Sequence, residues 1–392
     1  MRRALLAWEG GGGRGHLVTL KTVAEALSDR FEFDAALCRM DHAGEIEALC
    51  EQVFPAAYLW LRDEPRRSSG VGCATWGEYL GDIGFRDQAF LARQIAWWQE
   101  VIRVREISLV IGDFAPCALL AARGLGVPAC GVGTGYSCPP AAMAEFPVLL
   151  GSHPKRIYDE AEMLAAVNAA ATPLGVPEFD RLPAIYDCDD QLVRTLPMLD
   201  PYVAHREGDL LPPVADVPGG ISDGAGEEVF VYFSTTERAN PALMEALEDL
   251  GAPTRLFMPN IAEDLAARLA ARGVIVERAP VPVDLIARRS RLILHAGQHG
   301  ILCLGLACGL PQVAVPQHME QLYHARRAEE AGVLRVALHR EIDVAAFRDL
   351  VRACLADEEM ARRARSLARD LRPLLTRDPR RLIRRRVLAA AW

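Results

Sequence analysis

The stretch WEGGGGRGHL, residues 8–17, holds the first residues whose types and spacing could do chemistry. Gly10, Gly12 and Gly15 match the G-x-G-x-x-G pattern of dinucleotide-binding loops, which follow a strand and open a helix. Four adjacent glycines satisfy almost any such spacing, so the match is weak evidence for a dinucleotide. The same glycines leave His16 bare, and a neutral imidazole within reach of a hydroxyl can act as a general base.

A second glycine-rich segment, residues 291–333, carries groups suited to a phosphate and a sugar. An apolar strand is expected to end at His295, followed by a tight turn at residues 296–297 and a helix. The backbone N–H groups and the positive dipole end of such a helix suit a diphosphate, and His295 can add a donor to a phosphate oxygen. Further on, Glu320 and Gln321 place a carboxylate beside a carboxamide, which suits the hydroxyls of a sugar.

Strand and helix patterns alternate around both segments. Strand candidates such as ALLAW and LVIGDFA in the first half, and VFVYFS and LILHAG in the second, are separated by helical stretches, which predicts parallel sheets with covered faces. The sequence at 210–228 is rich in Pro, Gly and Asp and indicates a linker. We therefore expect an α/β chain of two facing Rossmann-like domains, 1–212 and 229–372, with a linker at 213–228 and a ligand cleft at the carboxyl ends of the strands.

Composition narrows the classes of function. The net charge of −8 argues against nonspecific nucleic-acid binding. The ten cysteines form no C-x-x-C pair, which indicates reduced, buried thiols. The apolar run after Arg2 and Arg3 is too short for a signal peptide, and no run reaches the roughly 18 residues of a membrane span. We expect a cytoplasmic protein.

The carboxyl-terminal tail, residues 373–392, combines a cluster of five arginines at positions 380–386 with an apolar stripe. Contact with a membrane surface is one interpretation. The pattern favours the other, a helix that packs its apolar stripe back on the N-terminal domain.

The segment 291–333 resembles the donor signature of the UDP-glycosyltransferase superfamily, especially its bacterial macrolide-type branch. That signature runs His-Gly-Gly-x-Gly-Thr-x-x-Glu, then Gly-x-Pro-x-x-x-x-Pro, then Asp/Glu-Gln. The chain supplies His295, Gly297, Gly309, Pro311, Pro316, Glu320 and Gln321. LVIGDFAPCALLAARGLGVPACGVG and the middle segment LGVPEFDRL also resemble the family, so the likeness spans nearly the whole chain. It implies the GT-B fold, with the acceptor on the first domain and the nucleotide-sugar on the second.

The resemblance also implies roles for residues. The histidine of the family's N-terminal Gly-His element is the general base and corresponds to His16, and Asp113 falls where an aspartate orients that base. The implied reaction is an inverting displacement with a nucleoside diphosphate leaving and with no metal or other cofactor. Asp187 and Asp189 imitate an Asp-x-Asp metal motif, but their loop position indicates an accidental match.

The donor site departs from the family pattern. His299–Gly300 replaces a Gly-Thr pair, Cys303 replaces a ribose-binding glutamate, and Arg278 falls near an aromatic residue that stacks on the base. UDP and dTDP sugars therefore both stay open. The residues expected to bind the donor are Ser234, Thr235, Thr236, Arg278, His295, Gly297, Gln298, His299, Gly300, Glu320 and Gln321.

Aromatic residues gather between positions 54 and 98 and again at 133–150. They favour a small apolar or aromatic acceptor, although any single one of them could instead belong to the core. The residues expected to bind the acceptor are Gly13, Trp76, Tyr79, Tyr136 and Phe146. Two alternatives remain at this point: a transferase that acts on a lipid-linked acceptor at a membrane, and a nonenzymatic partner that keeps the fold. The expected assembly is a monomer or a homodimer.

Overall fold

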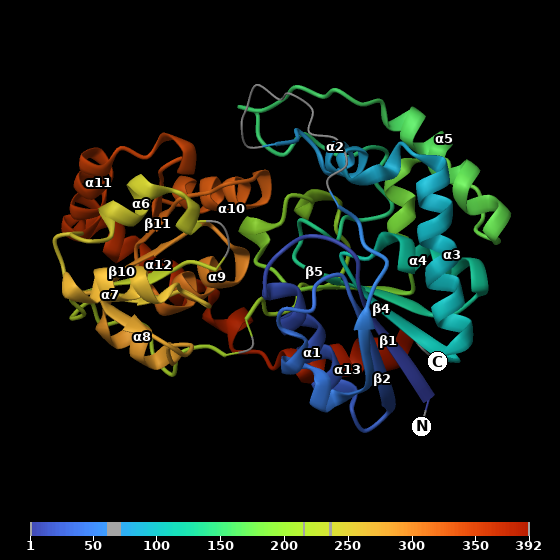
Figure 1. Ribbon diagram of the computed structural model, residues 1–392, viewed down its shortest axis with the longest axis horizontal. Coiled ribbons are helices and arrows are strands. Elements are labelled where there is room, and N and C mark those ends of the chain that lie inside the picture. Colours follow the sequence, from blue (N-terminus) through green and yellow to red (C-terminus); the bar gives the residue numbers. More distant parts are fainter. Residues whose placement is uncertain (1, 61–71, 215, 235–236, 391–392) are drawn as a thin grey trace. The chain divides into compact units, whose positions relative to one another are not determined.

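The computed structural model describes residues 2–60, 72–214, 216–234 and 237–390. The chain forms two compact units, Met1–Leu211 together with Asp378–Trp392, and Pro212–Arg377 (Figure 1). Each unit is built on a six-stranded sheet. Every strand pair in both sheets is parallel.

The first unit has the strand order of a doubly wound sheet, which runs outward in both directions from a central pair. The order is β3 (Cys50–Pro55), β2 (Phe31–Leu37), β1 (Arg2–Trp8), β4 (Ile107–Asp113), β5 (Ala129–Gly133) and β6 (Asp190–Val193). The central strands are apolar because both faces of the sheet are covered. The helices of this unit are α1 (Gly15–Leu27), α2 (Trp76–Leu80), α3 (Gln88–Val104), α4 (Pro116–Leu125), α5 (Glu160–Ala171) and α13 (Pro379–Ala390).

Helix α13 brings the end of the chain back to the first unit, where it packs against α1 (Figure 1). Ile383 and Val387 are fully buried in the same core cluster as Leu20 of α1. Arginines on the other faces of the helix pair with acidic residues of the first unit: Arg380 with Glu25, Arg384 with Asp29, and Arg386 with Asp190. The segment that belongs to the first unit starts at Asp378, because α12 keeps the chain in the second unit until Leu375.

The second unit repeats the same plan. Its strand order is β12 (Leu334–Val336), β11 (Gln312–Ala314), β10 (Ser290–His295), β7 (Glu228–Tyr232), β8 (Thr254–Phe257) and β9 (Ile275–Glu277). Its helices are α6 (Pro241–Ala246), α7 (Glu263–Ala271), α8 (Val283–Arg289), α9 (His299–Cys308), α10 (Met319–Glu330), α11 (Val344–Ala356) and α12 (Glu358–Leu375). Two doubly wound parallel sheets confirm the fold class expected from the sequence.

Two further observations concern the whole chain. All ten cysteines are free thiols. Within the described residues, no helix is both long enough and apolar enough to cross a membrane.

Candidate functional site

The first group of candidate residues lies at the carboxyl edge of the first sheet. Trp8 and Asp113 end the neighbouring strands β1 and β4 and are partners in the strand register. His16 lies in the first turn of α1, which follows the glycine run directly. Its Nδ1 atom is 2.9 Å from Oδ1 of Asp113. The structure thus brings together the two residues that the sequence predicts as base and orienting carboxylate.

The burial of this pair is uneven. The Asp113 side chain is 2% exposed and the His16 side chain is 20% exposed. A carboxylate can only accept hydrogen bonds, so the contact with Asp113 places the imidazole proton on Nδ1. Nε2 is then the acceptor nitrogen of the ring. The indole of Trp8 stacks on the imidazole with ring centroids 5.1 Å apart. The ring is therefore held from one face and from one edge.

At positions 10, 11 and 13 the structure shows why a glycine fits better than another residue. A Cβ on Gly11 would stand 2.9 Å from Nε2 of His16, and Gly11 also has φ +83°. A Cβ on Gly10 would stand 3.1 Å from the ring of Phe114. Gly13 has φ +101° and open space around it. The absence of a side chain at Gly11 keeps a Cβ away from Nε2 of His16, as the general-base interpretation of this loop requires.

The second group of candidates surrounds the turn from β10 to α9 in the second unit. His295 is fully buried and both of its ring nitrogens are bonded within the chain. Its Nδ1 accepts the N–H of Gly297 at 2.8 Å, and its Nε2 donates to Oε1 of Gln312 at 2.8 Å. Burial lowers the pKa of His295 to about 4, so the ring is neutral. The expectation that His295 donates to a phosphate is therefore wrong: the residue braces the turn from inside.

Gln298 links this turn to the loop after β7. Its Oε1 accepts the N–H of Ala296 at 3.1 Å. Its Nε2 lies 2.7 Å from Oε1 of the buried Glu237 and 3.3 Å from Oγ of Ser234. The predicted donor residues Ser234 and Gln298 are thus in contact, and Glu237 is a third member that the sequence analysis missed.

The turn at Gly297 is closely packed, whereas the first turn of α9 at Gly300 is accessible. Gly297 has φ +91°, and a Cβ on it would lie 2.9 Å from the carbonyl oxygen of Gln321. Gly300 is exposed and has nothing within 4 Å of the position of a Cβ. The first turn of α9 therefore presents backbone at an accessible helix N-terminus, which suits an anion.

The other predicted donor residues have different surroundings. Gln321 is 4% exposed, and its Oε1 accepts the N–H of Gln317 at 2.9 Å. Glu320 is half-buried in the first turn of α10. His299 is buried against His324, with ring centroids 4.9 Å apart.

Two further donor predictions lie on other loops. Arg278 is exposed and forms two bonds of 2.7 Å to the carboxylate of Glu263. Thr235 and Thr236 lie outside the described residues.

Three of the residues predicted to contact the acceptor belong to the core. Trp76, Tyr136 and Phe146 are 1%, 4% and 0% exposed. Trp76 packs against Tyr136 and Phe114, and its Nε1 donates to the hydroxyl of Tyr186 at 2.7 Å. The structure thus places these three rings in the aromatic packing at this edge of the sheet, and their contact with an acceptor stays a prediction.

Tyr79 keeps its place among the acceptor candidates. It is half-buried and lies 6.0 Å from Phe114 between ring centroids. Gly13, in the glycine run beside His16, is the other remaining candidate. Tyr79 contacts Phe114, the residue after Asp113, and Gly13 belongs to the loop that leads to His16.

The loop after β3 carries the most exposed aromatic side chains of the described region. Tyr58 and Trp60 are 45% and 42% exposed and contact each other. They flank Leu59, whose N–H donates to the carbonyl of Glu9 at 2.6 Å, next to the glycine run. The sequence indicates these two residues only through the enrichment of aromatic residues between positions 54 and 98. That enrichment does not predict which rings are exposed.

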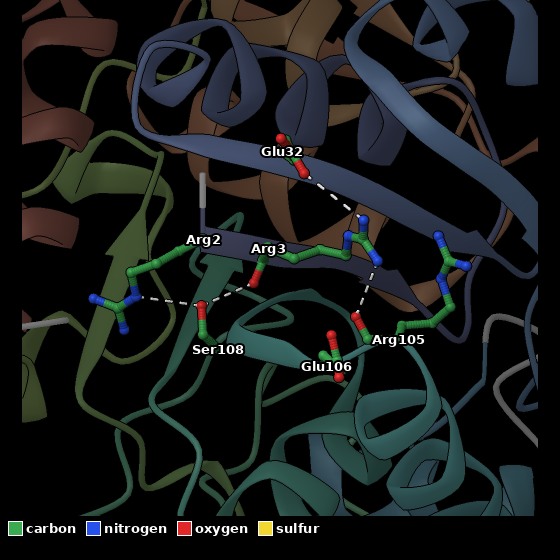
Figure 2. Close-up of a pocket in the computed structure, with 6 residues that line it drawn as sticks. All are labelled: Arg2, Arg3, Glu32, Arg105, Glu106 and Ser108. Atoms are coloured by element: carbon green, nitrogen blue, oxygen red, sulfur yellow. Dashed lines mark hydrogen bonds and ion pairs between the residues drawn. The ribbon is translucent and has the colours of Figure 1, made fainter.

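A cavity of about 250 Å³ lies at the opposite, amino-terminal edge of the first sheet (Figure 2). Figure 2 shows Arg3 directed at Glu32, 3.7 Å away. Arg105, which also lines the cavity, pairs with Asp34 at 2.8 Å. Arg3 and Arg105 are paired with carboxylates and Arg2 bonds to the hydroxyl of Ser108, which disfavours this cavity as a phosphate site.

The Asp-x-Asp segment has structural partners. Asp187 pairs with Arg123 at 3.0 Å, and Asp189 accepts the N–H of Ala129 at 2.8 Å. Over the part of the chain that the structure describes, no three His, Cys, Asp or Glu side chains are grouped to hold a metal ion.

Known proteins resemble the chain in fold more than in sequence. No protein-family model matches it. A curated relative, the NDP-glycosyltransferase YjiC of Bacillus subtilis (strain 168), is 24% identical over 114 residues. That match spans 29% of this chain and 28% of the relative.

Solved structures match over nearly the whole chain. The glycosyltransferase VinC in complex with dTDP has a TM-score of 0.66 at 19% identity and 99% coverage of both chains. CalG4, the calicheamicin glycosyltransferase, has a TM-score of 0.70 at 16% identity and covers 100% of this chain and 98% of its own. The spinosyn rhamnosyltransferase SpnG complexed with spinosyn aglycone has a TM-score of 0.63 at 17% identity, with 98% and 99% coverage. The chain has the GT-B fold of these enzymes.

Proposed function

We propose that the protein is an inverting glycosyltransferase that moves a sugar from a nucleoside-diphosphate sugar to a hydroxyl of a small, apolar or aromatic acceptor. The observation that carries the proposal is the His16–Asp113 pair: 2.9 Å between Nδ1 and Oδ1, with the aspartate buried and the imidazole half-open. The GT-B fold supplies the second support.

His16 acts as the general base in this proposal. Nε2 takes the proton of the acceptor hydroxyl while the oxygen attacks the anomeric carbon of the sugar, and the bond to the diphosphate breaks. A bond forms between the acceptor oxygen and the anomeric carbon while the oxygen loses its proton. The diphosphate leaves with the electron pair of the broken bond. Asp113 stabilises the imidazolium that forms.

The second unit binds the donor. The first turn of α9 faces the leaving diphosphate with backbone N–H groups, which stabilise its developing charge without a metal or another cofactor. Gln298, bonded to Glu237 and Ala296, holds that turn in place. VinC binds dTDP with the same fold, which favours dTDP sugars over UDP sugars as the first donors to test.

The acceptor lies against the aromatic side chains beside His16. Tyr58, Trp60 and Tyr79 offer accessible rings, whereas Trp76 is closed off in the core. SpnG holds an aglycone and CalG4 is named for calicheamicin, which supports a small natural product as the acceptor. The tail arginines 380, 384 and 386 are paired inside the first unit, which argues against a membrane-bound, lipid-linked acceptor.

The test is donor hydrolysis and transfer with a panel of dTDP- and UDP-sugars. We expect release of nucleoside diphosphate from at least one donor, and its loss in His16→Ala at unchanged donor binding. His205→Ala, which removes an exposed histidine of the same unit, is the matched control and keeps full activity. If His16→Ala works like the parent, the base is misassigned. If no nucleoside diphosphate stabilises the protein against heat, the protein is a nonenzymatic partner instead.

A further inference from the structure

Glu9 is a fully buried carboxyl group that the mechanism above does not use. It follows β1 directly and precedes the glycine run. Burial raises its pKa to about 8, against the lowering effect of hydrogen bonds from Cys117 and Ala118. A buried carboxyl this close to a proposed catalytic base needs a structural explanation.

The side chain of Glu9 caps a helix from a distant part of the sequence. Oε2 accepts the N–H of Cys117 at 3.1 Å and Oε1 accepts the N–H of Ala118. These donors lie in the first turn of α4, where Pro116 has no N–H and the N-cap residue Ala115 has no side-chain acceptor. Glu9 therefore does for α4 what a local Ser or Asp does for most helices.

The backbone of Glu9 holds the same turn from its other end. Its N–H donates to the carbonyl of Phe114 at 3.2 Å. Phe114 has φ +45°, a left-handed conformation that is costly for an aromatic residue and persists only where its surroundings enforce it. Glu9 thus holds this turn at the carbonyl of the strained residue and again at the first turn of α4.

This turn bears directly on the base. Asp113 is the residue before Phe114, and its Oδ1 is the atom that holds Nδ1 of His16. If the Phe114 turn relaxes, Asp113 moves with it. The His16 ring also contacts Trp8, with ring centroids 5.1 Å apart, and Phe114, with ring centroids 6.3 Å apart, so the Phe114 turn touches the imidazole as well as its carboxylate partner.

We propose that Glu9 is a positioning residue for the His16–Asp113 pair: it fixes the Asp113–Phe114 turn through the N-terminus of α4 and through the Phe114 carbonyl. This inference rests on the proposed function for its effect on catalysis, but not for its effect on the geometry of the pair. The competing explanation is that Glu9 only stabilises the fold as a helix cap.

The experiment uses Glu9→Ala, Glu9→Gln and a matched control, Glu78→Gln. Glu78 is also a buried carboxylate that accepts two backbone N–H groups, from Ile157 and Tyr158 at 2.6 and 2.7 Å. The full-length proteins are compared by NMR titration of the His16 imidazole, by kcat and KM for the acceptor, and by melting temperature. The Asp113→Asn variant serves as the reference, because it gives the titration midpoint of His16 without its carboxylate partner.

We expect Glu9→Ala to move the His16 midpoint toward that of Asp113→Asn and to lower kcat by about 100-fold, the effect of a misplacement near 1 Å. Glu9→Gln keeps the size and one acceptor, so its midpoint falls between the parent and Glu9→Ala. Glu78→Gln lowers the melting temperature but leaves the midpoint and kcat unchanged.

Two results would overturn the inference. The first is a His16 midpoint that stays at the parent value in Glu9→Gln and, if it folds, in Glu9→Ala. The second is an equal shift in both variants, which would show that the acceptor atom kept by glutamine does not hold the turn. A parent protein that transfers no sugar would refute the proposed function alone, because the His16 titration still tests the positioning role.

Discussion

Asp113 and His16 form a pair with one buried end and one accessible end. Oδ1 of Asp113 lies 2.9 Å from Nδ1 of His16, and the two side chains are 2% and 20% exposed. The carboxylate is withdrawn from solvent, so it acts on the imidazole and not on water. This asymmetry is what a base needs to direct Nε2 at a substrate.

Asp113→Asn should lower kcat by about a thousandfold, since the amide no longer fixes the proton on Nδ1. Loss of the carboxylate also disfavours the imidazolium, so the acid limb of the kcat/KM profile should move to lower pH. The measurement is the pH–rate profile of sugar transfer. Asp187→Asn, which alters a carboxylate paired with Arg123, is the control and should match the parent. An unchanged profile in Asp113→Asn would contradict the assignment.

Gly11→Ala should reduce transfer strongly. The new Cβ would stand 2.9 Å from Nε2 of His16, at a residue with φ +83°. The free energy of unfolding should fall by about 1–2 kcal/mol, as for a non-glycine residue at positive φ. The activation free energy that corresponds to the loss of kcat should rise by more than this. Gly12→Ala is the matched control, because the nearest atom to its Cβ is Nη1 of Arg39 at 3.5 Å. Equal kcat values for the two alanine variants would show that the glycine run does not protect Nε2.

The fold was predictable because both sheets are buried on both faces. Strands such as β1 are then apolar throughout their buried stretch, residues 4–8, and the helices between the strands show an amphipathic pattern. The positions of His16 and Asp113 were predictable for a related reason. Each lies where a central strand or its loop ends, and the carboxyl ends of parallel strands share one edge of the sheet.

The contacts of the candidate donor and acceptor residues were not predictable. His295 and Gln312 lie on the neighbouring strands β10 and β11, so their bond depends on strand register. Trp76 and Trp60 look alike in the sequence, yet one is 1% exposed and the other 42%. Glu9 reaches the first turn of a helix more than a hundred residues away, which no local pattern indicates.

Gln298→Ala should weaken donor binding. The carboxamide joins Ala296 to Glu237, so its loss frees the turn that presents the N-terminus of α9. We expect the Kd for dTDP to rise about tenfold, corresponding to one or two lost hydrogen bonds. Isothermal titration calorimetry measures this directly.

Gln298→Glu is the companion variant for the same turn. It places a carboxylate beside Glu237 and near the diphosphate, so it should bind dTDP more weakly than Gln298→Ala. A Kd that is the same in the parent and in both variants would exclude the turn from the donor site.

His295 should make the second unit less stable in acid. Burial lowers its pKa from 6.5 to about 4. Between those values the unfolded chain binds a proton that the folded chain does not, so the free energy of unfolding falls as the pH falls from 6.5 to 4. A pKa lowered by roughly 2.5 units corresponds to about 3 kcal/mol of unfolding free energy, at about 1.4 kcal/mol per unit.

Denaturant unfolding at a series of pH values tests this. His295→Gln lowers stability near pH 7, because it leaves the Gly297 N–H and the Gln312 carboxamide with altered partners, but it should flatten the decline toward pH 4. Part of the slope should persist, since burial also holds the pKa of His324 well below its usual value. His205→Gln, an exposed change, should keep the parental slope. A slope that His295→Gln leaves untouched would mean that His295 is not the neutral, buried brace of the donor turn.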